Sequence, residues 1–203
     1  MKTENRVSAS FPYGRLAYFV TSNIHKFLEA RRVLAEYGLA TAKLGVEAVE
    51  IQDDSLENIA NFSALDAVKN CGLPVFVEDA GLFVDALGGF PGPYSAYVYR
   101  TIEPQGVLKL MEGIENRAAH FQSVISFCSP GEEPICFSGR VDGRISVAER
   151  GAGGFGYDPI FVPSKDDRTF AEMSMDEKNG YSHRAESLRK FAEWYISFNK
   201  RRF

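Results

Sequence analysis

The sequence predicts an α/β fold built on a mixed sheet, and two patterns lead to this prediction. In the first half of the chain, short apolar runs alternate with stretches of helical character, as in folds whose helices pack on a sheet. In the second half, two long runs of strand-forming residues flank a short turn, which is typical of an antiparallel hairpin. Ligands in such folds bind where loops leave the ends of strands, so functional residues are expected there.

The first elements are a strand and a helix. Leu16–Val20 is an apolar run rich in strand formers. Asn23 follows it as a natural N-cap, and Gly38 is a natural stop for the helix between them. A strand that leads directly into a helix is therefore expected at the start of the fold.

A second strand and a second helix are expected next. The apolar-leaning run Leu44–Ile51 predicts the strand. Asp54 is expected to cap a helix that continues to about Asn70, and Gly72 and Pro74 are expected to end it.

The middle of the chain combines a short strand with a segment dense in turns. The β-branched and aromatic run Val75–Val77 predicts a strand that stops at Glu78 and Asp79. Glycines and prolines crowd residues 88–93, and the following segment 107–113 is expected to be helical.

The last part of the chain predicts a hairpin, a loop and a final helix. The hairpin strands are His120–Cys128 and Ile135–Val147. Residues 151–158 are too rich in glycine for the interior of a helix or strand and are expected to form a loop. The final helix is expected to begin near Ser182 and to place these residues on one face: Ala185, Leu188, Phe191, Ala192 and Tyr195.

Length and composition predict one domain over residues 15–203, preceded by a polar extension over residues 1–14. A chain of 203 residues with 45% hydrophobic content can bury a substantial core. The first residues lack the apolar segment of a secretory signal. No apolar run reaches the roughly 18 residues that indicate a membrane span, so no membrane partner is expected.

Charge and cysteine usage narrow the class of protein further. A formal net charge of -4 without a dense Lys/Arg run argues against nucleic acid as a partner. Three cysteines without CxxC spacing argue against a disulfide framework and a zinc site, and they favour a cytoplasmic location. Cys128 and Cys136 flank the hairpin turn and could face each other, but buried free thiols are the preferred interpretation.

The first candidate site is the junction between the first strand and the first helix. A helix N-terminus presents backbone N–H groups that bind phosphate. Lys26 lies in the first turn, where a cation opposes the helix macrodipole unless an anion lies nearby. The alternative is an ordinary surface lysine. The candidate phosphate-binding residues are Thr21, Ser22, Asn23, Ile24, His25 and Lys26.

The second candidate site is a set of carboxylates. Glu78 and Asp79 are adjacent acids after an apolar strand, and Gly81 permits a close backbone approach. Hard oxygen ligands suit Mg²⁺, which bridges triphosphate oxygens. Glu50 is a possible third metal ligand. The alternatives are a turn-forming Asp79 and a solvated Glu50.

The third candidate site pairs the glycine-rich loop with residues near the final helix. Phe155 and Tyr157 offer aromatic faces for a base, while Asp158 and Arg184 offer opposite hydrogen-bonding characters for its edge. Two basic residues at a helix start again oppose the macrodipole. The alternative is that Ser182 caps the helix and its neighbours are solvated. The candidates are Phe155, Gly156, Tyr157, Asp158, Lys178, His183 and Arg184.

Together, the three sites resemble the inosine/xanthosine triphosphate pyrophosphatase family, from Tyr18 to Phe191. The matching pieces, in order, are TSNIHK, VEDAGLFVDALGGFPGPYSAY, FSGRVDGRI, GGFGYDPIF, TFAEMSMDEKN and SHR. The resemblance implies an elongated, two-lobed α/β fold with a long central mixed sheet flanked by helices, a nucleotide cleft between the lobes, and a homodimer. It also implies hydrolysis of aberrant purine nucleotides (ITP, dITP, XTP) to the monophosphate and pyrophosphate with Mg²⁺.

The resemblance also implies roles for individual residues. Residues 21–26 resemble the phosphate-binding segment, with Lys26 on the triphosphate. Asp79 resembles the metal-linked catalytic acid, with Ala80 beside it in contact with substrate, and Glu50 resembles a metal-binding glutamate. The base-binding residues correspond to Phe155 to Asp158, Lys178 corresponds to a phosphate- or substrate-binding lysine, and His183 and Arg184 correspond to the pair that closes over the purine.

Two departures from the family pattern concern the substrate. Ala80 stands where many relatives have Ser or Thr, so a hydroxyl contact is missing. A lysine that some relatives carry in the second helix is also missing, because the nearby positions are Asn61, Phe62 and Ser63.

Two other function classes compete with the enzyme. A non-catalytic purine nucleotide sensor needs a phosphate site and a base pocket but no metal-held water, so the pair Glu78 and Asp79 favours the enzyme. A nucleic-acid module built on Phe155 and Tyr157 conflicts with the net acidity of the chain.

Overall fold

In the structure, a computed structural model, the described residues are 15–202, with side chains described from residue 15 to residue 197. The predicted extension over residues 1–14 lies outside the described residues. A seven-stranded mixed sheet forms the centre, in the order β2-β1-β3-β5-β6-β7, with β4 paired to β3. The parallel strands are β1 (Leu16–Val20), β2 (Ala40–Leu44) and β3 (Val75–Val84). The strands with antiparallel neighbours are β4 (Pro91–Gly92), β5 (Ala118–Cys128), β6 (Ile135–Ile145) and β7 (Phe161–Pro163).

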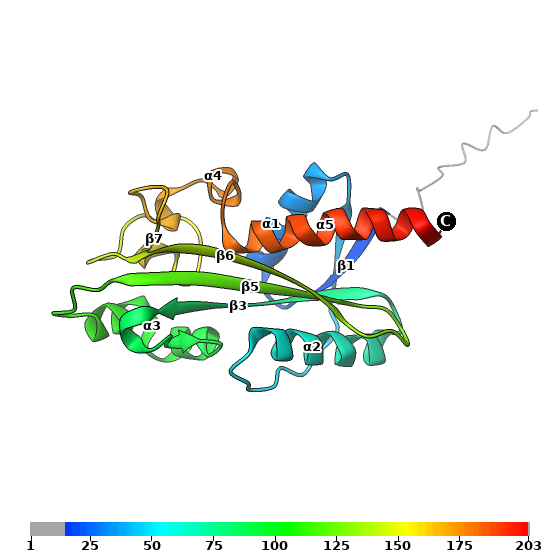
Figure 1. Ribbon diagram of the computed structural model, residues 1–203, viewed down its shortest axis with the longest axis horizontal. Coiled ribbons are helices and arrows are strands. Elements are labelled where there is room, and N and C mark those ends of the chain that lie inside the picture. The colour runs from blue at the N-terminus through cyan, green and yellow to red at the C-terminus, as the bar shows by residue number, and fades with distance from the viewer. Residues whose placement is uncertain (1–14, 203) are drawn as a thin grey trace, which may run out of the picture.

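Helices cover both faces of this sheet (Figure 1). On one face α1 (Ile24–Glu36) packs against α5 (His183–Arg202), with α4 (Met175–Asn179) nearby. On the other face lie α2 (Leu56–Cys71) and α3 (Ser95–Leu110). Within residues 15–202 there are also three 3₁₀ turns: η1 (Asp85–Leu87), η2 (Asp158–Ile160) and η3 (Phe170–Glu172). The predicted α/β fold with a mixed sheet flanked by helices is confirmed.

The molecule is elongated because β3, β5 and β6 are 10, 11 and 11 residues long. Apolar side chains form three clusters along these strands. One lies between the sheet and α1 and α5, around Phe76 and Phe191, and another lies under α2. The third, around Phe121 and Phe170, fills the other end of the molecule beneath η2 and η3. The first two clusters lie on opposite faces of the sheet at one end of the molecule and form one lobe, and the third cluster forms the other lobe.

The second strand begins and ends earlier than predicted. β2 is Ala40–Leu44, and residues 45–51 form no strand. β2 pairs with β1 in parallel, and β1 itself ends at Val20, so the residues after Leu44 have no partner strand. Instead, Val46 and Ala48 pack on the cluster under α2, and the backbone N–H of Val49 donates to Asp66 Oδ2 at 3.0 Å.

The N-cap of α2 is Ser55, and the prediction of Asp54 is wrong. Ser55 Oγ accepts a hydrogen bond from the backbone N–H of Asn58, and Asp53 Oδ1 accepts one from the N–H of Ser55. The predicted stop is confirmed, since Gly72 caps the helix with a left-handed φ of 67°.

Glu78 and Asp79 lie inside β3, although the sequence predicted that the strand stops there. β5 pairs with β3 along its whole length, from Val75 to Val84, and this continuous partner keeps the strand extended beyond the acids. On the other side, β1 pairs with β3 only at Phe76. The acids therefore follow the point where β1 leaves the sheet, and that edge of β3 is open for a site.

The remaining predicted elements are confirmed with small shifts. The hairpin is β5 and β6, and the final helix begins at His183, with Ser182 Oγ accepting from the N–H of Ala185. Helix α3 begins at Ser95, well before the predicted segment 107–113, and it breaks at Glu103 (φ 56°) before Pro104. It ends at Leu110, so it contains the predicted segment only in part.

The cysteines are free thiols, as preferred. In the hairpin register Cys136 lies opposite Ser126, so Cys128 does not face it. Cys128 is buried as predicted, whereas Cys136 is half-buried, so the prediction of a buried thiol is wrong there; Cys71 is also half-buried. Within the described residues, no helix is long and apolar enough to cross a membrane.

Candidate active site

The junction of β1 and α1 forms a tightly capped turn. Asn23 Oδ1 accepts hydrogen bonds from the backbone N–H groups of His25 at 2.9 Å and Lys26 at 3.2 Å. Thr21 Oγ1 in turn accepts from the N–H of Asn23 at 3.1 Å. The Asn23 cap therefore already occupies two of the helix-start N–H groups that were expected to bind phosphate, those of His25 and Lys26.

Lys26 extends from this turn toward β3. Its Nζ lies 2.9 Å from Glu78 Oε2 and donates to the Glu78 carbonyl oxygen at 3.1 Å. The side chain keeps 19% exposure, so Lys26 also reaches the surface of a cavity. An anion does lie beside this first-turn lysine, as the macrodipole argument required, and it is the carboxylate of Glu78.

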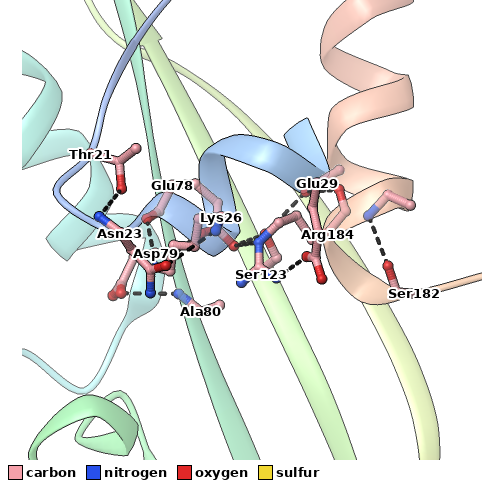
Figure 2. Close-up of polar contacts among 12 residues, drawn as sticks. Thr21, Asn23, Lys26, Glu29, Glu78, Asp79, Ala80, Ser123, Ser182 and Arg184 are labelled. Carbon is pink, nitrogen blue, oxygen red and sulfur yellow. Dashed lines mark hydrogen bonds and ion pairs between the residues drawn. The ribbon is translucent and has the colours of Figure 1, made fainter. Parts of the chain in front are cut away.

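A chain of ion pairs continues from Glu78 through Arg184 to Glu29, as Figure 2 shows, and from Glu29 to Lys178 and Asp158. Arg184 Nε lies 3.0 Å from Glu78 Oε1, and Arg184 Nη1 lies 2.6 Å from Glu29 Oε2. Lys178 Nζ then lies 2.8 Å from Glu29 Oε1 and 2.6 Å from Asp158 Oδ2. Cations and carboxylates alternate along this network, which we call the ion-pair chain: Lys26, Glu78, Arg184, Glu29, Lys178 and Asp158.

Burial and charge act in opposite directions on the acids of the ion-pair chain. Burial disfavours the ionised form of Glu78, but Arg184 and Lys26 outweigh it and lower the pKa to about 2. In the same way, Arg184 and Lys178 overcome burial and lower the pKa of Glu29. Burial prevails at Asp158 and raises its pKa in spite of Lys178. Breaking one partner of such a buried pair leaves an uncompensated charge, so the chain holds its members in fixed positions.

Asp79 has a different environment from its neighbour Glu78. Successive side chains of a strand point to opposite faces, and Asp79 is therefore directed away from Arg184. Its Oδ1 accepts from the backbone N–H of Ala80 at 3.0 Å. Burial raises the pKa of Asp79 to about 6, with Lys26 opposing the rise and the carboxylates of Glu78 and Glu50 adding to it.

Two adjoining cavities form a cleft around Asp79. The larger, of about 880 Å³, lies between the β1–α1 turn, the loop before α2, and α2 itself. The smaller, of about 500 Å³, extends toward η2 and the start of α5. The same residues stand at the junction of the two cavities: Asn23, Lys26, Glu50, Ile59, Asp79, Ala96 and Arg100. A cleft is thus present where the resemblance implied one.

Aromatic and cationic groups line the smaller cavity. The ring of Phe155 stacks on His25 with 5.1 Å between ring centroids, and Lys178 Nζ lies 4.8 Å from the Phe155 centroid. The hydroxyl of Tyr157 donates to the carbonyl oxygen of Ser95 at 3.0 Å, which ties the loop to α3. Gly156 has a left-handed φ of 63°, a conformation that favours glycine.

His183 contributes a neutral ring to this cavity. Burial, with Arg184 and Lys178 nearby, holds the pKa of His183 well below its usual range. The imidazole stacks on Phe121 with 4.6 Å between centroids. Its Nδ1 is buried and has no hydrogen-bond partner among the described residues, so it is a candidate for contact with a ligand.

The carboxylates can be tested against a magnesium ion. The described residues contain no cluster of three or more His, Cys, Asp or Glu side chains that would hold a metal by themselves. Mg²⁺ usually binds through one or two carboxylates together with substrate phosphates. Asp79 and Glu50 fit this requirement because both line the junction of the cavities, whereas Glu78 already contacts Ser123, Arg184 and Lys26.

The sequence and the fold both match known proteins. A model of the Ham1 family matches residues 17–194, which is most of the chain. The chain belongs to the Ham1 family. The dITP/XTP pyrophosphatase of Methanopyrus kandleri is 52% identical over 177 residues, covering 87% of this chain and 94% of that protein. The dITP/XTP pyrophosphatase of Thermococcus kodakarensis is 54% identical over 180 residues, covering 89% and 96%. The solved structure of a HAM1 protein from Coxiella burnetii has a TM-score of 0.80 at 28% identity, covering 90% of this chain and 98% of that one.

Most residues predicted from the sequence line the cleft of this Ham1 protein. The predicted residues that line the larger cavity are Thr21, Ser22, Asn23, Lys26, Glu50, Glu78 and Asp79. Those that line the smaller cavity are His25, Ala80, Phe155, Gly156, Tyr157, Asp158, Lys178, His183 and Arg184. Ile24 is the exception, because it lines neither cavity and its side chain is 50% exposed.

Two polar residues that contact the ion-pair chain of this Ham1 site from within it or beside it, Glu29 and Ser123, were not predicted from the sequence. Glu29 bridges Arg184 and Lys178, and Ser123 donates to Glu78 Oε1 at 2.7 Å. A signal for Glu29 was present, since it falls on the same helix face as the buried Ala30 and Val33, where a charge requires a partner. Ser123 carries no such signal, because its partner Glu78 is 45 residues away in the sequence.

Proposed function

We propose that this chain hydrolyses aberrant purine nucleoside triphosphates (ITP, dITP and XTP) to the monophosphate and pyrophosphate. The observation that carries the proposal is the position of Asp79, a half-buried carboxylate with a raised pKa beside Lys26 at the junction of two cavities. The relatives named dITP/XTP pyrophosphatase, at about half identity over most of the chain, support this class of substrate.

In the proposed reaction the phosphates occupy the larger cavity and the base occupies the smaller. Asp79 orients the attacking water and accepts its proton as the new bond from oxygen to phosphorus forms. The bond between the α and β phosphates breaks, and pyrophosphate leaves with its charge stabilised by Lys26. Lys178 lines only the smaller cavity, so we assign it to the nucleoside part of the substrate.

We also propose that the reaction requires Mg²⁺. Asp79 and Glu50 would hold the ion, and it would neutralise charge on the phosphate oxygens. Glu78, the third predicted ligand, would hold Lys26 and Arg184 in place through the ion pairs that it already makes.

Selection between bases would depend on the atom at position 6 of the purine. Hypoxanthine and xanthine present a carbonyl oxygen there, whereas adenine presents an amino group. Arg184 uses Nε and Nη1 in ion pairs, and its Nη2 has no hydrogen-bond partner among the described residues. A carbonyl oxygen would accept from such a donor, and an amino group would leave it unpaired, so discrimination on the order of 10⁴-fold is expected in a well-built site.

One panel of nucleotides tests the proposal against a sensor. Release of monophosphate and pyrophosphate from ITP, dITP, XTP, GTP and ATP is measured with Mg²⁺ and with a chelator. We expect rapid, Mg²⁺-dependent turnover of the first three and slow turnover of ATP. Tight binding of ITP without turnover would instead support the non-catalytic sensor. Strongly salt-dependent binding of an oligonucleotide would be needed to support the nucleic-acid module.

The proposal extends to the assembly and location implied by the resemblance. We expect a homodimer, which light scattering after gel filtration would detect as a mass near twice 22.6 kDa. A mass of one chain at micromolar concentration would contradict it. A cytoplasmic location agrees with three free cysteines, which persist in a reducing compartment.

A further inference from the structure

The cleft holds too little free positive charge for a triphosphate. In the ion-pair chain, the formal charges of three cations and three carboxylates cancel. Asp79 and Glu50 then make the junction of the cavities acidic. An anionic substrate at this junction needs at least one further cation from the protein, even when a divalent ion accompanies the phosphates.

The wall formed by α2 does not supply that cation. The α2 residues that line the larger cavity are Ile59, Ala60, Ser63, Asp66 and Asn70, and none is basic. Ser63 is committed elsewhere, since its hydroxyl donates to the carbonyl oxygen of Val49 at 3.1 Å. The cation must therefore come from a different element.

Helix α3 supplies an arginine at the right place. Arg100 lines both cavities, together with Ala96 one turn earlier on the same face of the helix. Its side chain is exposed and, among the described Lys and Arg residues that line the cleft, it alone has no ion pair or hydrogen bond. Lys26, Lys178 and Arg184 are all paired.

The helix segment that carries Arg100 is firmly anchored. Ser95 Oγ accepts from the backbone N–H of Leu82 at 2.8 Å and donates to the carbonyl oxygen of Gly92 at 2.7 Å. The ring of Tyr99 meets Tyr157 edge-on, with 5.8 Å between centroids. The segment is fixed to β3 and to η2, while the Arg100 side chain itself is free to turn toward a ligand.

We propose that Arg100, from the α3 side of the cleft, binds the phosphates of the substrate distal to the nucleoside. A guanidinium presents a planar fork that matches phosphate oxygens, and it keeps its charge at every working pH. The phosphates then contact Lys26 from α1 and Arg100 from α3, which line both cavities together with Asp79. This inference rests on the proposed function, because that function identifies the substrate as a nucleoside triphosphate. Binding of a polyphosphate by Arg100 does not depend on the reaction.

Three variants test this role: Arg100→Gln, Arg100→Lys and the control Lys109→Gln. Lys109 is an exposed cation of the same helix that lines neither cavity. For Arg100→Gln we expect the KM for ITP and the inhibition constant of inorganic tripolyphosphate to rise about tenfold or more, since charge-assisted hydrogen bonds are lost. Inhibition by IMP, which lacks the distal phosphates, should change less than about twofold. Arg100→Lys should give intermediate values, and Lys109→Gln should match the wild type.

The outcomes separate this inference from the proposed function. Wild-type turnover of ITP with unchanged constants in Arg100→Gln overturns the role of Arg100 and leaves the function standing. An equal loss of IMP inhibition also overturns it, because the contact would then be to the nucleoside monophosphate part. If the wild type turns over no nucleotide but tripolyphosphate binding still depends on Arg100, the function fails and the inference holds. Circular dichroism confirms that each variant is folded.

Discussion

Adjacent carboxylates in β3 have opposite protonation behaviour, and their surroundings explain the difference. Glu78 faces two cations and has a pKa of about 2, whereas Asp79 is half-buried near other carboxylates and has a pKa of about 6. Pairs of acids whose pKa values are driven apart in this way commonly divide structural and chemical roles. We assign the structural role to Glu78 and the chemical role to Asp79.

The role of Glu78 predicts a pH-dependent contribution to stability. Its pKa falls from 4.5 to about 2 on folding, so its ionised form stabilises the protein above pH 4.5, and this stabilisation is lost as the pH falls toward 2. The full effect is about 3 kcal/mol. We therefore expect the difference in free energy of unfolding between the wild type and Glu78→Gln to shrink as the pH falls from about 5 to about 2.5. Urea denaturation without metal measures this difference at each pH. Glu112→Gln, at an exposed position, should show no such trend. A constant difference for Glu78→Gln would contradict its assignment.

The role of Asp79 predicts a loss of turnover. Asparagine has a similar shape but does not accept a proton, so Asp79→Asn should lower kcat for ITP by about 100-fold or more. Binding of ITP, measured by calorimetry, should change far less. Asp85→Asn, at an exposed position beyond the end of β3, serves as the control. Near-normal turnover in Asp79→Asn would remove Asp79 from the mechanism.

At the scale of elements, the position of α5 depends on a glycine in β6. A Cβ on Gly139 would overlap the carbonyl oxygen of His183 and would lie 2.6 Å from the backbone nitrogen of Ser187. The helix therefore lies directly on the strand at this point, and this contact fixes the start of α5, which carries His183 and Arg184. Packing between two elements thus sets the position of side chains in the cleft.

Replacing this glycine should move the helix. We expect Gly139→Ala to destabilise the protein by about 1–3 kcal/mol, as overpacking does, and to reduce kcat/KM for ITP because His183 and Arg184 are displaced. Urea denaturation and the pyrophosphate assay measure the two effects. Gly45→Ala provides the matched control, since a Cβ at Gly45 meets no atom within 4 Å. Equal stability of the two variants would show that α5 is not constrained at Gly139.

At the scale of the whole molecule, the long strands connect the two lobes. Strand β5 contributes Ile125 and Phe127 to the cluster beneath α5, and it contributes Phe121 to the cluster at the other end. The ion-pair chain also joins elements from both ends, since it links α1 and β3 to η2. We therefore expect residues 15–203 to unfold as one cooperative unit.

A substitution in one lobe tests this cooperativity from the other. Phe170 is fully buried in the cluster beneath η2 and η3. Trp194, the single tryptophan, packs on the cluster beneath α5, in the other lobe. Phe170→Ala should cost about 3–5 kcal/mol. It should also shift the unfolding midpoint of Trp194 fluorescence as much as that of circular dichroism. An unchanged fluorescence midpoint would show that the lobes unfold independently.

The sequence by itself determined the features that local signals encode. Asn23 at a helix start and the hairpin with its turn were predicted correctly, as was the glycine-rich loop over residues 151–158 except for Asp158, which begins η2. Capping and turn chemistry act within a few residues, so local sequence encodes them. The candidate residues of the cleft were found for a similar reason. They occur in short segments at the ends of predicted elements, and the order of these segments resembles the family pattern.

Only the tertiary structure decided how these segments meet. β3 continues past Glu78 and Asp79 because β5 pairs with it over its whole length, which nothing local to residues 75–79 specifies. Likewise, Arg184 binds Glu78 and Glu29 across separations of 106 and 155 residues. A buried charge needs a partner, but the partner is chosen by which elements the fold packs together. The sequence therefore contained the charged groups of the site, and the packing of α1, β3 and α5 determined their pairing.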